Sequence, residues 1–355
     1  MPTHRLFGIE QEHFVLHTDG SPSAHAEIDQ LYDALRTDGF RTRTTNRHGQ
    51  VLAVSRPTEF GELVVTNDSC THILEVAFPP LRDLSEFRAM YAEVFGLLNE
   101  RLRPHGLSIQ RGAVFDPPPL EIHWRPKETD PEGERLKKII SREPLVHPLF
   151  AASFPALFAA THVSLSVPAD EAYPRLESYY AYEFLVPLLF SNSRSFQGVA
   201  GHCIRPLAWR ANFHQPYPLL GIPDPIPTSR QQYEAQRSAS PFRDYSFVAV
   251  RDAHRLEFRA ACSQDTVEEI EQLIRFHLAV DAAVTRGVRP PIDGWTPQML
   301  FQQACLEPTS ELIEVARAAL ETLGAESCAA LLHRLPTKSR ACQFSGQVHA
   351  EAEEV

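Results

Sequence analysis

Residues 7–16 read FGIEQEHFVL, a run with the apolar content of a β-strand that nevertheless carries Glu10 and Glu12. Side chains two residues apart in a strand leave the same face of a sheet, so both carboxylates point to one side. At a separation of about 7 Å and an effective dielectric constant of about 20, their repulsion is about 2.5 kcal/mol. Two explanations remain open. Either this face meets water, as one face of many antiparallel sheets does, or a divalent cation with several oxygen ligands binds both groups.

The cation hypothesis predicts further acidic side chains on neighbouring strands. In TNDSCTHILEVAFPP (66–80), Asp68 precedes a predicted strand and Glu75 lies within it, while Leu74 and Val76 point to the opposite face. A single glutamate in a strand is typical of a solvent-exposed face. This segment is therefore informative only together with others.

Two later segments, ATHVSLSVP (160–168) and HRLEFRAACS (254–263), alternate between an apolar and a polar face. The polar faces carry His162, Ser164 and Ser166 in the first segment and Arg255, Glu257 and Arg259 in the second. A polar strand face is often simply solvated, and an arginine beside a glutamate is often a cross-strand pair. Repetition of the same plan on four strands favours a metal-rich site.

The candidate metal ligands are Glu10, Glu12, Asp68, Glu75, His162 and Glu257. Carboxylates with one imidazole and no suitably spaced thiolate favour Mg²⁺ or Mn²⁺ over Zn²⁺. Arg259 suits a phosphate oxygen held beside such a metal, because guanidinium donors match phosphoryl geometry. The sequence has neither G-x-x-x-x-G-K-[ST] nor a strand-linked G-x-G-x-x-G, so ATP would bind through metal ions and side chains.

The composition indicates a globular protein. With 355 residues, 43% of them hydrophobic, the chain can bury a substantial core, and a formal charge of −11 disfavours nonspecific nucleic-acid binding. No apolar run reaches the roughly 18 residues of a membrane span, and the N-terminus MPTHRLFGIE has no export signal, which predicts a cytoplasmic protein. Six cysteines without a C-x-x-C pair argue against a zinc knuckle or a disulfide framework.

Hydrophobic periodicity predicts an α+β fold with a largely antiparallel sheet. Short strands are expected between 43 and 80, ending at Pro79 and Pro80. Helices are expected at 23–37, 83–106, 172–193 (kinked or ended by Pro187), 265–287 with an acidic N-cap, 296–305 and 308–334. We expect one catalytic domain over 1–335, a flexible tail over 336–355, and a lid in the proline-rich and charged loop 117–134.

Five segments, in order, resemble the glutamate-cysteine ligase family, specifically the bacterial carboxylate-amine ligase type within the glutamine synthetase-like superfamily. They are GIEQEHFVL, TNDSCTHILEVAFPP, THVSLSVP, SNSRSFQGVAG through WR, and RLEFRAACSQD, and together they span most of residues 7–265. The resemblance implies a curved antiparallel sheet that forms a funnel, with helices packed on its convex face. It also implies that magnesium and the phosphates of ATP lie against the acidic face.

The resemblance assigns roles to individual residues. The six candidate ligands match positions that bind metal or nucleotide, with His162 also near the ATP phosphates; Arg259 matches the position that contacts the transferred phosphate, and Glu257 and Arg259 form the catalytic pair. Arg205 or Arg210 resembles the substrate-binding arginine of the family, although the spacing departs from the family pattern and a surface arginine fits equally well. The usual His-x-His of the third segment is His162-Val163-Ser164 here, which leaves the role of Ser164 open.

The function that the resemblance implies is ATP-dependent ligation of a carboxylate to an amine through an acyl phosphate, with the γ-carboxylate of glutamate and the amine of cysteine as substrates. Three alternatives remain open. They are a ligase for a different amino acid or amine, a guanidino phosphotransferase of the same superfamily, and a catalytically silent protein that binds metal or nucleotide. The expected partners are small molecules, without nucleic acid or membrane, and the sequence does not indicate an oligomeric state.

Overall fold

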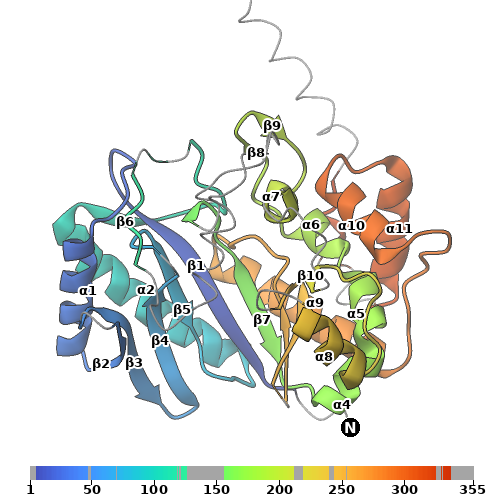
Figure 1. Cartoon of the computed structure of the whole chain (residues 1–355), viewed down its shortest axis with the longest axis horizontal. Coiled ribbons are helices and arrows are strands. Elements are labelled where there is room, and N and C mark those ends of the chain that lie inside the picture. The colour runs from blue at the N-terminus through green and yellow to red at the C-terminus, as the bar shows by residue number, and fades with distance from the viewer. Residues whose placement is uncertain are drawn as a thin grey trace, which may run out of the picture.

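The computed structural model describes residues 5–46, 49–68, 70–117, 119, 121–125, 156–211, 219–239, 244–252, 254–324, 329 and 331–336. These residues form an α+β fold built on an antiparallel sheet, as the sequence predicts (Figure 1). Residues 126–134 of the expected lid and 337–355 of the expected tail lie outside the described residues. Both assignments therefore stay predictions.

The main sheet is organised around β1 (Phe7–His17), its longest strand. The strand order is β12-β13-β7-β1-β5-β4-β3-β2, and β6 also pairs with β1; all of these pairs are antiparallel. The bounds are β2 Arg41–Thr45, β3 Val51–Thr58, β4 Gly61–Asn67, β5 Ile73–Ala77, β6 Leu107–Gln110, β7 Thr161–Leu165, β12 Val248–Asp252 and β13 Arg255–Phe258. Two small sheets pair β8 (Ser195–Phe196) with β9 (Val199–Ala200) and β10 (Leu220–Gly221) with β11 (Tyr245–Ser246).

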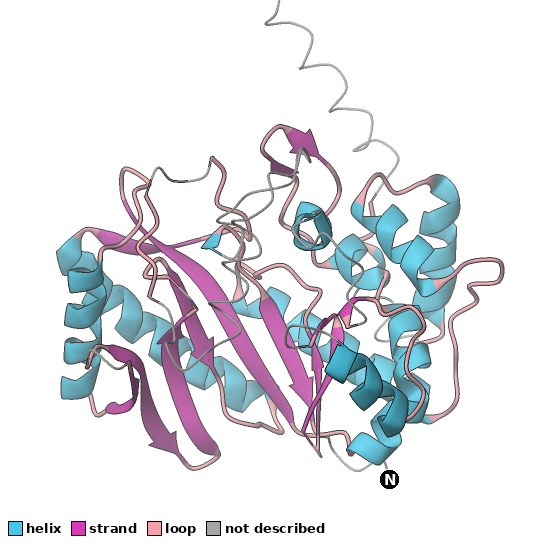
Figure 2. Cartoon of the chain, viewed as in Figure 1, coloured by secondary structure: helices cyan, strands magenta, loops and turns pink. Residues whose placement is uncertain are grey.

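Among the described helices, α1 (His25–Thr37) packs on β3, α2 (Leu84–Leu102) on β6 and α9 (Val267–Thr285) on β7, while the short helices α4 (Ala169–Ala172) and α5 (Leu176–Tyr182) contact β12 (Figure 2). The other helices are α6 Leu185–Leu189, α7 Ile204–Ala211, α8 Arg230–Ala239, α10 Pro297–Cys305 and α11 Ser310–Glu321, with 3₁₀ turns η1 Arg103–His105 and η3 Tyr173–Arg175. Among the described residues, no helix combines the length and hydropathy needed to cross a membrane.

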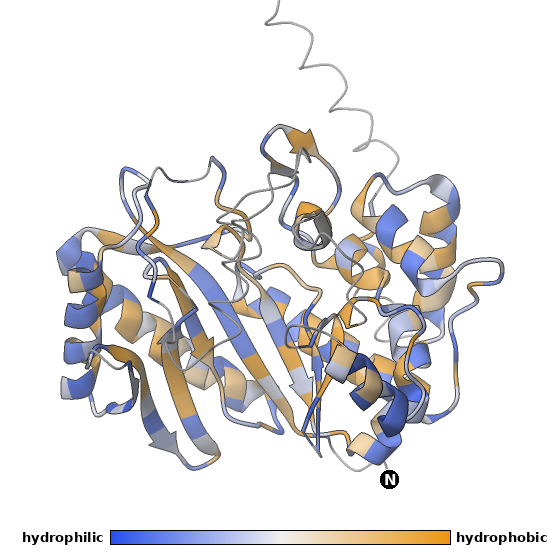
Figure 3. Cartoon of the chain, in the orientation of Figure 1, coloured by the Kyte–Doolittle hydropathy of each residue, from blue (hydrophilic) through white to orange (hydrophobic). Residues whose placement is uncertain are grey.

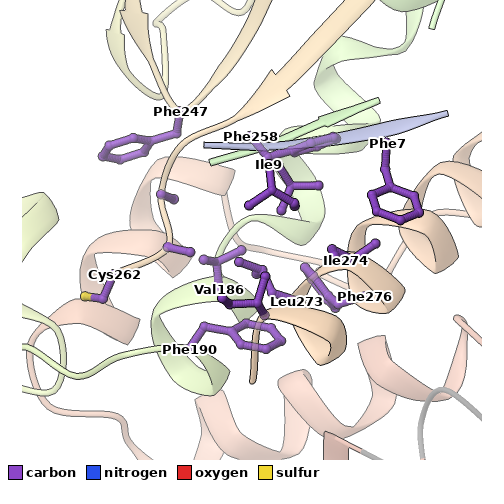
Figure 4. Close-up of a cluster of buried hydrophobic side chains, with 14 of the residues drawn as sticks. Phe7, Ile9, Val186, Phe190, Phe247, Phe258, Cys262, Leu273, Ile274 and Phe276 are labelled. Carbon is purple, nitrogen blue, oxygen red and sulfur yellow. The ribbon is translucent and has the colours of Figure 1, made fainter. Parts of the chain in front are cut away.

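The main core lies between the sheet and these helices. Phe7 and Ile9 of β1 and Phe258 of β13 meet Leu273 and other apolar side chains of α9 there (Figure 4). Along β1 the odd-numbered apolar residues Phe7, Ile9 and Val15 enter this core, and the ribbon carries both hydrophobic and hydrophilic stretches (Figure 3). Because successive side chains of a strand point to opposite faces, the even-numbered side chains of β1, including both glutamates, lie on the other face.

Three helix predictions need correction. The segment 172–193 is broken into α4, η3, α5 and α6, and the break between α5 and α6 falls at Glu183 and Phe184 rather than at Pro187. Proline lacks the N–H that would bond the carbonyl four residues earlier, and its ring clashes with that carbonyl, which here belongs to Glu183. That carbonyl instead accepts the N–H of Val186 at 3.0 Å.

The other two predictions concern the ends of helices. The N-cap of α9 is Thr266, whose hydroxyl accepts the N–H of Glu269, and not the acidic Asp265 that the sequence suggested. The side-chain oxygen of a threonine can accept a backbone N–H of the first turn as an aspartate oxygen can, so either residue is a suitable N-cap. The predicted helix 308–334 ends earlier, since α11 stops at Glu321 and Gly324 adopts a positive φ of 106°.

Candidate active site

Five of the predicted ligands lie on one face of the main sheet, which we call the acidic face. The strand register places Glu10 opposite His162, Glu12 opposite Glu75, and Glu257 opposite Ser164. Residues directly opposite each other in an antiparallel pair project from the same face. The acidic face is therefore made of Glu10, Glu12, Glu75, His162, Ser164 and Glu257, from β1, β5, β7 and β13.

Three of these residues form a compact cluster. One ligand atom each from Glu10, His162 and Glu257 lies within 4.8 Å of the other two, and His162 Nδ1 is 3.3 Å from Glu10 Oε2. A proton on Nδ1 would leave the lone pair of Nε2 free for a cation. Two carboxylates and one imidazole are a donor set that fits Mg²⁺ or Mn²⁺.

Glu257 is held by two arginines at this cluster. Arg251 binds its carboxylate through two parallel contacts, Nε to Oε2 at 2.9 Å and Nη2 to Oε1 at 2.8 Å, and Arg259 Nε lies 3.1 Å from Oε1. Burial alone would raise the pKa of Glu257, but the charges of Arg259 and Arg251 and the Arg251 hydrogen bonds outweigh it and lower this pKa to about 2. Glu257 is therefore an anion at neutral pH.

Arg251 was not singled out from the sequence, because the pattern along one strand does not show which residue of the neighbouring strand stands opposite it. The register places Ala249 opposite Glu257, so alternation along β12 puts Arg251 on the face of Glu257, next to the register shift between Val250 and Asp252. Arg255 is also at the site, with Nη1 3.8 Å from Glu10 Oε1. The alternating Arg255, Glu257 and Arg259 was the available sequence signal for Arg255, whereas Arg251 becomes a candidate only once β12 is known to pair with β13.

Glu12 lies deeper than Glu10. Its Oε2 accepts the backbone N–H of Ala160 at 2.7 Å, and burial raises the pKa of Glu12 to about 6, opposed by His162 and Arg205 and assisted by Asp68. Asp68 follows the last residue of β4, and its charge acts on Glu12 from there. Asp68 and Glu75 are half-buried and belong to the same neighbourhood without joining the compact cluster.

The two predicted substrate arginines differ in position. Arg205 is 5% exposed, and its Nη1 donates to the carbonyls of Arg259, Ala260 and Ala261 at 3.2, 3.3 and 3.3 Å. These contacts make it a support for the segment that carries Arg259. Arg210 lies in α7, but its side chain is outside the described residues.

No family model matches this sequence, and neither does any curated protein. The fold, however, is similar to solved ligase structures. Glutamate–cysteine ligase from Francisella tularensis, in complex with AMP, has a TM-score of 0.55 and 12% identity over 97% of this chain and 83% of its own. A bifunctional glutathione synthetase from Pasteurella multocida has a TM-score of 0.56 and 14% identity over 95% of this chain and 48% of its own, so this chain spans about half of that enzyme.

The chain thus has the fold of these carboxylate–amine ligases. At 12% and 14% sequence identity this likeness concerns the fold alone. The chemistry depends on the residues of the acidic face. That face combines a cluster of three candidate cation ligands with Arg251, Arg255 and Arg259. Such an arrangement can hold a polyanion and its counter-cations side by side.

Proposed function

We propose that the protein is an ATP-dependent ligase that joins a carboxylate to an amine through an acyl phosphate. The observation that carries this proposal is the convergence of Glu10, His162 and Glu257 beside Arg259 on one sheet face. The likeness to the fold of a glutamate–cysteine ligase supports glutamate and cysteine as the first substrates to test.

Glu10, His162 and Glu257 would hold a first Mg²⁺ or Mn²⁺, and Glu12, Glu75 and Asp68 are the proposed ligands of a further ion. The donor chemistry of these residues fits such cations. A bound ion would neutralise charge on the triphosphate and polarise its γ-phosphoryl group. His162 is proposed to lie near the phosphates as well, because it belongs to the same cluster.

Arg259 is proposed to stabilise the phosphoryl group during transfer. Its guanidinium lies next to the anionic Glu257, with Nη1 bonded to the carbonyl of Asp244 at 3.0 Å, so its position is fixed before substrate binds. A preorganised cation lowers the barrier without reorganising during the reaction. Arg205 or Arg210 is proposed to bind the amino-acid substrate.

In the proposed reaction, an oxygen of the substrate carboxylate attacks the γ-phosphorus of ATP and ADP leaves. The amine then attacks the acyl carbon, and inorganic phosphate leaves with the original carboxylate oxygen. Glutamate labelled with ¹⁸O at the γ-carboxylate, incubated with MgATP and cysteine, should therefore yield ¹⁸O-labelled phosphate. Mass spectrometry of the released phosphate measures this transfer directly.

The same assay tests the acyl phosphate, because unlabelled phosphate from an enzyme that makes amide would exclude it. In a separate incubation of MgATP with a guanidino compound, a phosphorylated guanidino product would indicate a phosphotransferase. Arg259→Ala should reduce kcat by about 10²- to 10³-fold, as expected on loss of a group that stabilises transition-state charge. Arg101→Ala is a suitable control, because Arg101 pairs with Asp38 in the helix layer and should leave kcat unchanged.

A further inference from the structure

The guanidinium of Arg259 is anchored by a main-chain atom of Asp244. Arg259 Nη1 donates to the carbonyl oxygen of Asp244 at 3.0 Å, and the guanidinium carbon lies 5.7 Å from the ring centroid of the adjacent Tyr245. The carbonyl can hold Arg259 only if the peptide at Asp244 keeps its orientation. The contacts of the Asp244 side chain therefore help to fix the position of Arg259.

The carboxylate of Asp244 is buried and bound on both oxygens. Oδ1 accepts the backbone N–H of Ser246 at 2.8 Å and also the Ser246 hydroxyl, while Oδ2 accepts the hydroxyl of Tyr233 from α8. Tyr233 is itself 1% exposed. A carboxylate fixed by three donors in a buried setting holds its residue in one conformation.

The hydroxyl of Tyr233 has a second set of contacts on β12. It accepts the N–H of Val250 at 3.2 Å and lies 3.3 Å from the Val250 carbonyl. Val250 directly precedes Arg251, the bulge residue that binds Glu257 through two contacts. One hydroxyl thus touches both segments that place an arginine on Glu257.

We propose that Tyr233 is a positioning residue that acts through Asp244 to hold Arg259, and through Val250 to hold Arg251, against Glu257; this rests on the proposed function for its kinetic consequence. Tyr233 does not need to touch any substrate. An error of about 1 Å in the position of a catalytic group can cost about 10²-fold in rate, so a remote hydroxyl can matter.

The chain offers a matched control for this hydroxyl. Tyr179 is also fully buried and donates its hydroxyl to a buried carboxylate, Asp281 Oδ1, at 2.6 Å. Asp281 in turn pairs with Arg5 at 3.1 Å and not with any arginine at the acidic face. Tyr233→Phe and Tyr179→Phe therefore remove the same chemical bond in two places.

The first measurement is the binding of MgATP to the full chain by calorimetry. Tyr233→Phe should weaken binding about tenfold, the effect expected from losing about 1.4 kcal/mol, whereas Tyr179→Phe should match the unmodified protein. Both variants should lower the melting temperature. Equal MgATP affinity in Tyr233→Phe and Tyr179→Phe would overturn the positioning role.

The second measurement is a double-mutant cycle with Arg259→Lys. If Tyr233 acts through Arg259, then Tyr233→Phe should weaken MgATP binding less in the Arg259→Lys background than alone. A fully additive pair would overturn the link to Arg259. Ser246→Ala, which removes one hydroxyl from Asp244 but keeps the backbone N–H, gives a milder variant if Tyr233→Phe does not fold.

A third measurement does not depend on nucleotide binding. Phenylglyoxal modifies accessible arginines, and the rate at Arg259, followed by peptide mass spectrometry, should rise several-fold in Tyr233→Phe and stay unchanged in Tyr179→Phe. If the unmodified protein binds no MgATP, the proposed function fails while this rate still decides the positioning of Arg259. An unchanged rate in Tyr233→Phe would overturn the inference by itself.

Discussion

Glu257 belongs both to the cluster of candidate cation ligands and to ion pairs with two arginines. It is 3% exposed on its side chain and binds Arg251 and Arg259. Removing one partner from a buried ion pair costs about 3–5 kcal/mol, since a charge is left without compensation. The folded protein therefore relies on Arg251 and Arg259 to hold Glu257 as an anion.

This arrangement predicts that Arg251 and a divalent cation substitute for each other at Glu257. Arg251→Met should lower the free energy of unfolding by about 3 kcal/mol without divalent metal, because only Arg259 then balances the buried carboxylate. Mg²⁺ at saturating concentration should raise the melting temperature of the unmodified protein, and raise that of Arg251→Met by more. Thermal unfolding with and without Mg²⁺ measures both responses.

The control for this prediction is Arg88→Met. Arg88 also binds a glutamate through two contacts, to Glu271 Oε1 and Oε2 at 2.8 and 2.7 Å, but in the helix layer. Its variant should show the same Mg²⁺ response as the unmodified protein. If neither Mg²⁺ nor Mn²⁺ changed the melting temperature of the unmodified protein, the proposed metal site would be contradicted.

At the scale of elements, alternation along strands was sufficient to assign side chains to faces. The period of two in a strand requires no knowledge of the partner strand, so Glu10, Glu12, Glu75, His162 and Glu257 could all be placed on polar faces. Which residues stand opposite one another depends on pairing between distant segments, and single-sequence periodicity does not contain it. The neighbours Glu10 and His162, 152 residues apart, illustrate this limit.

The contacts that sequence analysis missed depend on strand pairing or on main-chain atoms, and the pattern of side chains along the sequence shows neither. Arg251 reaches Glu257 only through the pairing of β12 with β13, which the side-chain pattern along one strand does not show. Asp244 holds Arg259 through its carbonyl oxygen, a group that every residue possesses and that leaves no mark on the pattern of side chains. Helix breaks are similar, since Pro187 predicted an interruption but its effect falls four residues earlier, at Glu183.

The break between α5 and α6 also leaves a buried acid. Glu183 is 1% exposed, and its Oε2 has no hydrogen-bond partner within the described part of the chain. Burial raises the pKa of Glu183 well above its ordinary value. Because the folded pKa exceeds the unfolded one, the favourable contribution is present below the unfolded value near 4.5 and is lost as the pH rises.

Glu183→Gln should therefore be more stable than the unmodified protein at pH 7 and lose this advantage towards pH 4. The difference should change by about 1.4 kcal/mol per pH unit while the acid stays protonated only in the folded state. Denaturant unfolding across pH 4–8 gives this difference. Glu177→Gln on α5, where the side chain is 54% exposed, is the matched control. If the stabilities of Glu183→Gln and the unmodified protein ran parallel from pH 4 to pH 8, the raised pKa of Glu183 would be contradicted.

At the scale of the whole molecule, three buried histidines in different layers respond to acid in the same direction. His13 lies on β1 against Phe95, His277 on α9 stacks on Phe258 with centroids 4.1 Å apart, and His202 precedes α7. Burial lowers the pKa of His13 to about 4, of His202 to about 4 and of His277 to about 3. Each must stay neutral in the folded protein.

These lowered pKa values make the folded protein less stable in acid, because the unfolded chain binds the protons at a higher pH than the folded chain does. The unfolded chain takes up a proton at each histidine near pH 6.5, while the folded chain resists until the pH is far lower, so the contribution of these residues is complete above pH 6.5 and is lost as the pH falls. Glu12, with its pKa raised to about 6, acts in the opposite direction between about pH 4.5 and 6. The difference in unfolding free energy between the unmodified protein and a variant of one histidine cancels the contribution of Glu12, because Glu12 is present in both proteins.

His277→Phe provides that difference. Phenylalanine preserves the ring contact with Phe258 and cannot take a proton, so the stability of the variant relative to the unmodified protein should increase by about 1.4 kcal/mol for each pH unit below 6.5. Urea unfolding at pH 8, 6, 5 and 4 measures this slope, and a constant offset caused by repacking does not affect it. His254→Gln, at an exposed turn residue, should give a flat difference over the same range. A flat difference for His277→Phe would mean that His277 is solvated or charged in the folded protein, and the buried stacking of His277 on Phe258 would then be wrong.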